Sequence, residues 1–91
     1  MISLEKKQSL INMAKSNLTQ NEATLRKLQA TLEKDNQVRD FLYKTFPNNE
    51  DTLEEADQLV ANVERLIEQV EDLLISCAEN LRNVEALEVD E

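Results

Sequence analysis

The groups in this chain that could do chemistry are its carboxylates and one thiol, because the sequence contains no histidine. Cys77 allows two interpretations, a small apolar side chain within a helical core or a reactive thiol. No histidine or adjacent basic residue is present to activate the thiol, so the sequence favours the core interpretation. A single cysteine also excludes a disulfide within the chain, and one between two copies would require symmetry that brings them together.

Acidic residues offer a second candidate site, because they recur at heptad spacing along the second half of the chain. The series is either a strip that binds a basic partner or a solvated helix face. Neither a glycine-rich phosphate loop nor a cluster of typical metal ligands occurs in the sequence. The carboxylates are so numerous that pairs of them occur by chance, and no pair indicates an acid–base site. We therefore predict a protein that is not an enzyme, with no catalytic, cofactor-binding or metal-binding residues. The acidic series consists of Asp57, Glu64, Glu71 and Glu85, with Ala78 in the missing place.

The elements that position these groups follow from an apolar series in the second half of the chain. Its members are separated alternately by three and four residues, the spacing that places side chains on one stripe of a supercoiled helix. No polar residue interrupts the series, which indicates a helix that packs against other helices. The series is Leu53, Ala56, Val60, Val63, Ile67, Val70, Leu74, Cys77, Leu81 and Val84.

The first half has a heptad of its own, but a less regular one. Its a positions are Leu4, Ile11, Leu18, Leu25 and Leu32, and its d positions are Lys7, Ala14, Asn21, Leu28, Asp35 and Leu42. We expect Lys7 and Asp35 to be exposed near the ends of the helix. Asn21 is either an ordinary imperfection or a polar residue that fixes register or oligomeric state.

Pro47, followed by two asparagines, separates the two helical halves. We predict a first helix at residues 3–45, capped by Ser3 and ended by Phe46, because the residue before a proline is disfavoured in a helix. A turn at 46–51 precedes a second helix at 52–87, capped by Thr52 with Asp51 as the competing cap. Residues 88–91 are expected to fray, because acids there meet the negative end of the helix dipole. Residues 1–91 thus form one all-α, antiparallel two-helix hairpin of coiled-coil type.

Charge supports this pairing of the halves. Eight basic and five acidic residues precede Pro47, and two basic and fourteen acidic residues follow it, so the halves carry +3 and −12. A register that aligns Leu32 with Val63 joins apolar positions along both helices, and a shift by one heptad is the alternative. The seam that we predict within the chain consists of Ile11, Leu18, Leu25, Leu28, Leu32, Val63, Ile67, Val70, Cys77, Leu81 and Val84.

A third apolar position per heptad flanks this seam and makes the apolar face too wide for one neighbouring helix. We predict that this apolar ridge contacts a partner or a second copy and so completes a four-helix or larger bundle. The aromatic residues at the hairpin tip either plug the end of the bundle or dock a partner through Tyr43 and Phe46. The apolar ridge consists of Leu10, Val38, Leu59, Leu66, Leu73 and Leu87.

These features predict a scaffold, adaptor or tethering subunit that binds protein, as a homo-oligomer or as a helical subunit of a hetero-complex. The alternative is a chaperone-like or inhibitory protein whose acidic helix binds a basic client. The layout is similar to the helical arms of prefoldin subunits and to tubulin-folding cofactor A, a similarity of architecture that rests on no residue motif.

Charge and hydropathy limit the classes of partner and the cellular location that the sequence predicts. The net charge of −9 disfavours nucleic acid and acidic membrane surfaces as partners. No apolar run reaches the ~20 residues that span a bilayer. The single cysteine and a start without signal-peptide features predict a cytoplasmic location, with the nucleus not excluded.

Overall fold

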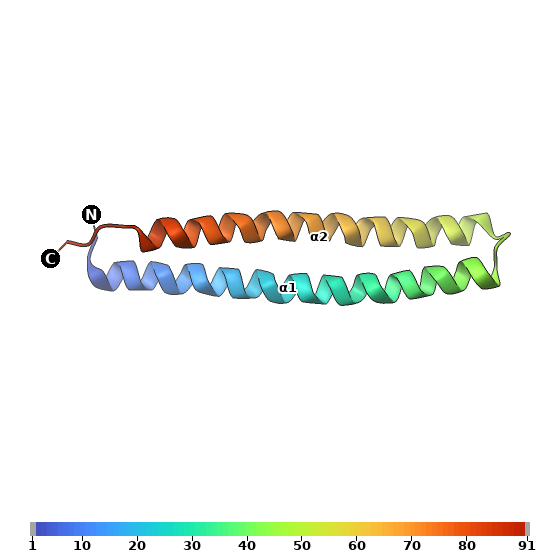
Figure 1. Ribbon diagram of the computed structural model, residues 1–91, viewed down its shortest axis with the longest axis horizontal. Helices are drawn as coiled ribbons and strands as arrows, with labels where there is room; N and C mark the ends of the chain where they lie inside the picture. Colours follow the sequence, from blue (N-terminus) through green and yellow to red (C-terminus); the bar gives the residue numbers. More distant parts are fainter. Residues whose placement is uncertain (1, 91) are drawn as a thin grey trace. The chain divides into compact units, whose positions relative to one another are not determined.

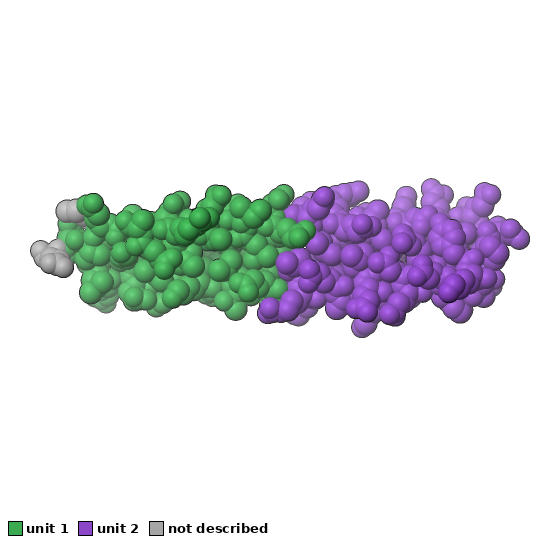
Figure 2. All heavy atoms as spheres, viewed as in Figure 1, with its two compact units in different colours: residues 1–24, 70–91 green, residues 25–69 purple. Residues whose placement is uncertain are grey.

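The computed structural model of the chain describes residues 2–90 and contains two long α-helices. α1 comprises Leu4–Thr45 and α2 comprises Glu50–Glu85, and they form an antiparallel helical hairpin (Figure 1). The predicted all-α hairpin is therefore confirmed. The chain divides into two compact units, which Figure 2 distinguishes by colour: unit 1 comprises residues 1–24 and 70–91, and unit 2 comprises residues 25–69. Each unit contains a segment of both helices.

The ends of α1 follow from local sequence signals. The side-chain oxygen of Ser3 accepts a hydrogen bond from the backbone N–H of Lys6 at 3.1 Å, which confirms Ser3 as the cap. At the other end, the N–H of Phe46 still bonds the carbonyl of Leu42 at 2.8 Å. The helix then stops before Pro47, because the proline ring disfavours helical geometry in the residue that precedes it.

The turn between the helices is shorter than the sequence predicts, and α2 begins at Glu50 instead of residue 52. The cap is Asn49, whose Oδ1 accepts a hydrogen bond from the backbone N–H of Thr52 at 3.3 Å. The predicted caps, Thr52 and Asp51, are therefore wrong. Asparagine is as good a cap as aspartate or threonine. Here the chain has already turned by Asn49, whose own N–H bonds the Phe46 carbonyl at 3.1 Å, so the helix begins at the next residue.

The chain after α2 also differs from the prediction. α2 ends at Glu85, short of residue 87, and an isolated bridge joins Ile2 to Val89. In this bridge the N–H of Ile2 donates to the Glu88 carbonyl at 3.4 Å, and the N–H of Asp90 donates to the Ile2 carbonyl at 2.7 Å. Backbone groups that follow the helix thus form hydrogen bonds with Ile2 instead of staying unpaired. The prediction that the chain frays is therefore wrong for residues 88–90. Residue 91 lies outside the described residues.

The apolar series of α2 faces α1 within each unit. In unit 2 the buried residues are Leu53, Ala56, Val60 and Val63, and in unit 1 they are Ala14 and Val70. The remaining seam residues are half-buried, because a single neighbouring helix covers only one stripe of each helix. Leu4, the first member of the α1 heptad, is 68% exposed. The half-buried seam residues are Ile11, Leu18, Leu25, Leu28, Leu32, Ile67, Leu74, Cys77, Leu81 and Val84.

Two polar residues of the α1 heptad lie deeper than predicted. Lys7 and Asp35 are half-buried, although we expected both to be exposed. Both occupy inward-facing positions, where the carbon atoms of a polar side chain pack against the other helix while the charged end stays in water.

Removal of the α2 cap gives a first test. We expect Asn49→Ala to lower the free energy of unfolding by about 1 kcal/mol, because the N–H of Thr52 loses its acceptor. Urea unfolding followed by circular dichroism measures this change. Asn48→Ala is the matched control in the same turn, and an equal loss of stability in both variants would contradict the capping role.

Removal of methyl groups from the core gives a second test. Val60 is only 2% exposed, so we expect Val60→Ala to destabilise the hairpin by about 2 kcal/mol through lost burial and a residual cavity. Ile75 is 60% exposed, and Ile75→Ala should change stability by less than about 0.5 kcal/mol. Thermal unfolding of both variants distinguishes a packed seam from a loose one, which would give two similar, small effects.

Candidate functional site

An uncovered apolar surface lies on one side of unit 2. Val38 of α1 and Leu59 of α2 are 55% and 58% exposed, and both line one hollow of ≈ 120 Å³. Leu66 is 47% exposed and follows Leu59 by one heptad on the same face of α2. All three are members of the apolar ridge. The hollow is lined by Asp35, Val38, Leu42, Thr52, Glu55, Ala56 and Leu59.

Phe41 belongs to the same surface, although it is not one of the predicted ridge residues. It is 60% exposed and lies three residues after Val38, so it shares that residue's side of α1. Its spacing from Val38 was the signal that could have identified it. The apolar ridge is therefore wider in unit 2 than the leucine pattern alone indicates.

Unit 1 carries its own part of the ridge, and this part is less uniform. Leu73 and Leu87 are 51% and 39% exposed, whereas Leu10 is half-buried and only partly available to a partner. Met13, which the sequence analysis did not assign, is 61% exposed three residues after Leu10.

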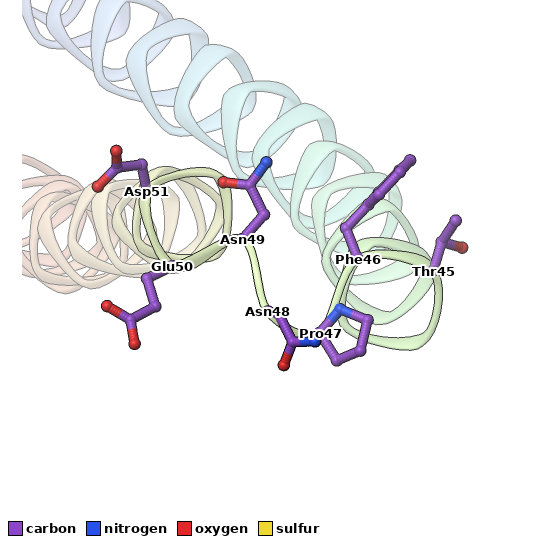
Figure 3. Close-up of a pocket in the computed structure, with 7 residues that line it drawn as sticks. All are labelled: Thr45, Phe46, Pro47, Asn48, Asn49, Glu50 and Asp51. Carbon is purple, nitrogen blue, oxygen red and sulfur yellow. The ribbon is translucent and has the colours of Figure 1, made fainter.

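The aromatic residues near the tip are partly exposed in the single hairpin. Tyr43 is 44% exposed and Phe46 is 49% exposed, and both the plug and the docking role stay predictions. Phe46 borders an open hollow of ≈ 650 Å³ at the turn, whose lining side chains point in different directions (Figure 3). Such a lining does not converge on a ligand. It consists of Thr45, Phe46, Pro47, Asn48, Asn49, Glu50 and Asp51.

A polar cluster occupies another part of unit 2. The hydroxyl of Tyr43 donates a hydrogen bond to Oδ2 of Asp57 at 2.7 Å, and Nη1 of Arg39 lies 3.9 Å from Oδ1 of the same carboxylate. Both charged side chains are partly exposed, so their ion pair contributes no more than about 1 kcal/mol. Asp57, the first member of the acidic series, is thus bonded within its own unit, although it is exposed like Glu64 and Glu71.

The hydrogen bond from Tyr43 has an electrostatic consequence. Because the phenol proton is shared with the Asp57 carboxylate, the pKa of Tyr43 is raised above 10.0, and the nearby Arg39 opposes this shift in part. Ionised tyrosine would lose the bond and face a second negative charge. Tyr43 therefore serves as a neutral hydrogen-bond donor that links α1 to α2.

Cys77 lies in unit 1, half-buried in the seam. The side-chain nitrogen of Asn21 donates a hydrogen bond to its sulfur at 3.3 Å. Asn21 therefore has a partner on the opposite helix, and Cys77 packs as a small core residue with weak acceptor character. This contact supports the core interpretation of the cysteine.

Within residues 2–90, no cluster of histidine, cysteine, aspartate and glutamate side chains could hold a metal ion. No helix of this range is long and apolar enough to cross a membrane. Comparisons with protein-family models, with curated proteins and with solved structures find no match to this chain.

Titration of Tyr43 tests the polar cluster. The chain has one tyrosine and no tryptophan, so the ultraviolet absorbance of phenolate reports Tyr43 alone. We expect Asp57→Asn to lower the pKa of Tyr43 toward 10.0, since the carboxylate that favours the protonated phenol is lost. In the unmodified chain the stability gained from this bond is fully present below pH 10.0 and is lost as the pH rises through the raised pKa.

Glu64→Gln is the matched control for that titration, because it removes a carboxylate from the next heptad of α2. It should leave the titration curve of Tyr43 nearly unchanged. Identical curves for the unmodified chain and Asp57→Asn would contradict the hydrogen bond.

Proposed function

We propose that this chain is a non-enzymatic helical assembly module of coiled-coil type that binds the helices of protein partners through its apolar ridge. It would act in the cytoplasm as a scaffold, adaptor or tethering subunit. The observation that supports this proposal most strongly is the exposure of Val38, Leu59 and Leu66 in unit 2, beside buried seam residues of α2. Large apolar side chains gathered on one side of a small protein are typical of a protein-interaction surface.

Physical considerations of stability favour the same function. A two-helix hairpin encloses little core, and small scaffolds of this kind normally gain stability from association. Complete burial of one leucine is worth roughly 1.5–3 kcal/mol, so the half-exposed ridge leucines retain about 1 kcal/mol each for binding. The association would use ordinary helix packing, with ridge side chains inserted between those of the partner.

The acidic binder remains a second candidate, supported by one observation. Glu64, Glu71 and Glu85 are exposed at heptad spacing on α2, on a face separate from the apolar ridge. A basic client could approach that face and be held by complementary charge. The two candidates therefore place the partner on different faces of the same helix.

Matched double variants separate these two functions. We expect Leu59→Asp with Leu66→Asp to reduce the binding of protein partners at least tenfold, because two carboxylates would be buried in an apolar contact. The partners are those that the immobilised chain retains from cell extract, including a differently tagged copy of itself, quantified by mass spectrometry. Both substitutions lie at exposed positions, so circular dichroism should show helical content close to that of the unmodified chain.

Glu64→Lys with Glu71→Lys is the control, since it reverses charge on α2 and leaves the ridge intact. Under the assembly function, this variant retains the partners. Loss of the partners from the charge-reversal variant, with retention by the ridge variant, would replace the assembly function with the acidic binder.

A further inference from the structure

On the ridge side of unit 2, α2 carries no acidic residue after Leu59, although α2 belongs to the strongly acidic half of the chain. From Leu59 onward, the side of α2 that carries the ridge presents only uncharged residues to solvent within this unit. The opposite side of α2 presents carboxylates over the same length. The residues on the ridge side are Leu59, Asn62, Leu66 and Gln69, and the carboxylates opposite are Asp57, Glu64 and Glu68.

α1 contributes positive charge to the ridge side of the same unit. Lys34 lies four residues before Val38, and Lys27 lies one heptad before Lys34, so both share the ridge face of α1. Both lysines are exposed. The ridge side of unit 2 thus consists of an apolar centre, neutral amides along α2 and two lysines along α1. Its acids are Glu55 and the half-buried Asp35, which both line the hollow.

This distribution of charge selects among occupants. A basic partner would be attracted to the acidic side of α2 and repelled by Lys27 and Lys34, so it does not fit the ridge. A partner for the ridge needs an apolar face with few charges of its own. We infer that the occupant is a second copy of this chain, whose identical ridge meets that requirement and can form a two-fold symmetric contact. This inference rests on the proposed assembly function.

Charge also selects one arrangement of the two copies. A two-fold axis parallel to the helices places α1 of each copy over α2 of the other. Lys27 and Lys34 then lie over α2 of the other copy, whose segment in unit 2 carries seven acidic residues and one arginine. Most of these acids lie away from the ridge side, so they attract the two lysines at longer range. The alternative two-fold axis, perpendicular to the helices, stacks α2 on α2 and brings the two acidic halves together.

A hollow beside the ridge can receive a side chain of the second copy. A stable interface buries about 800 Å² of each partner, and this chain exposes 6905 Å² in all. The hollow of ≈ 120 Å³ beside Val38 and Leu59 is comparable to the cavity of ~150 Å³ that accepts one benzene molecule in a protein core. An aliphatic side chain of the second copy's ridge can therefore enter it.

The mass of the purified chain in solution tests the identity of the occupant. Light scattering coupled to gel filtration should give twice 10.5 kDa. The Leu59→Asp with Leu66→Asp variant should dissociate at least a hundredfold more readily and elute at 10.5 kDa with its helical content retained. A particle of 10.5 kDa for the unmodified chain at millimolar concentration overturns the inference. The assembly function would survive that result if the same variant still lost a different protein partner.

A distance between the turns tests the arrangement. Asn48→Cys in a Cys77→Ser background allows a spin label on each turn. Helices are 10–12 Å across, so the parallel two-fold axis should place the two labels within roughly 30 Å of each other by pulsed electron resonance. A longer distance overturns the arrangement. Lys27→Glu with Lys34→Glu should weaken the dimer several-fold at low salt and much less at high salt, whereas tighter association of this variant would contradict the charge argument.

Discussion

Burial of the α2 seam against α1 is the interaction on which the hairpin depends. The most deeply buried seam residues are small, such as Ala14, Ala56 and Val60, and their size lets the helices approach closely. Two helices in close contact can exclude water from only one stripe of each. The larger side chains beside that stripe, including Leu59 and Leu66, consequently stay in contact with solvent. The apolar ridge is thus the direct result of a seam that covers only one stripe of each helix.

Charge divides the remaining surface into two kinds. On α2 in unit 2, Asp57, Glu64 and Glu68 lie on the side away from the ridge, whereas Glu55 lies on the ridge side. Asp57 also joins the helices through Tyr43 and Arg39. The ridge side lacks the first three acids and carries lysines on α1. A uniformly acidic helix would repel a second copy wherever the two met. Segregation of charge lets the same helix stay strongly solvated on one side and approach another helix on the other.

The parts of the fold that depend on local signals could be predicted from the sequence. The heptads predicted two helices, and Ser3 and Phe46 set the ends of α1, because each acts within one helical turn. Asn49 was missed as a cap because Asn49, Asp51 and Thr52 can each cap a helix that begins at the next residue, and the path of the turn decides among them. The bridge between Ile2 and Val89 could not be predicted, since it joins residues that are distant in sequence and no side-chain pattern records it.

The sequence predicted that an apolar surface flanks the seam, but it did not predict all the residues that form this surface. Heptad counting identified Leu59 and Leu66, because position within a heptad determines the side of a helix that a residue occupies. It did not identify Phe41, which lies outside the counted positions but remains 60% exposed on the same side as Val38. Counting also could not show that Leu10 is half-buried, because its exposure depends on how the nearby segment of α2 packs against it.

The short turn has a consequence for the order in which the hairpin forms. A contact between Phe46 and Asn49 closes a loop of very few residues, whereas the bridge between Ile2 and Val89 closes almost the entire chain. The entropy lost on closing a loop grows with its length, by about 0.6 kcal/mol for each doubling. Helix pairing that begins beside Pro47 therefore has the lowest entropic cost. Further contacts then form in order from the turn toward the two termini. On unfolding, the same connectivity makes the bridge at the termini the first contact to open.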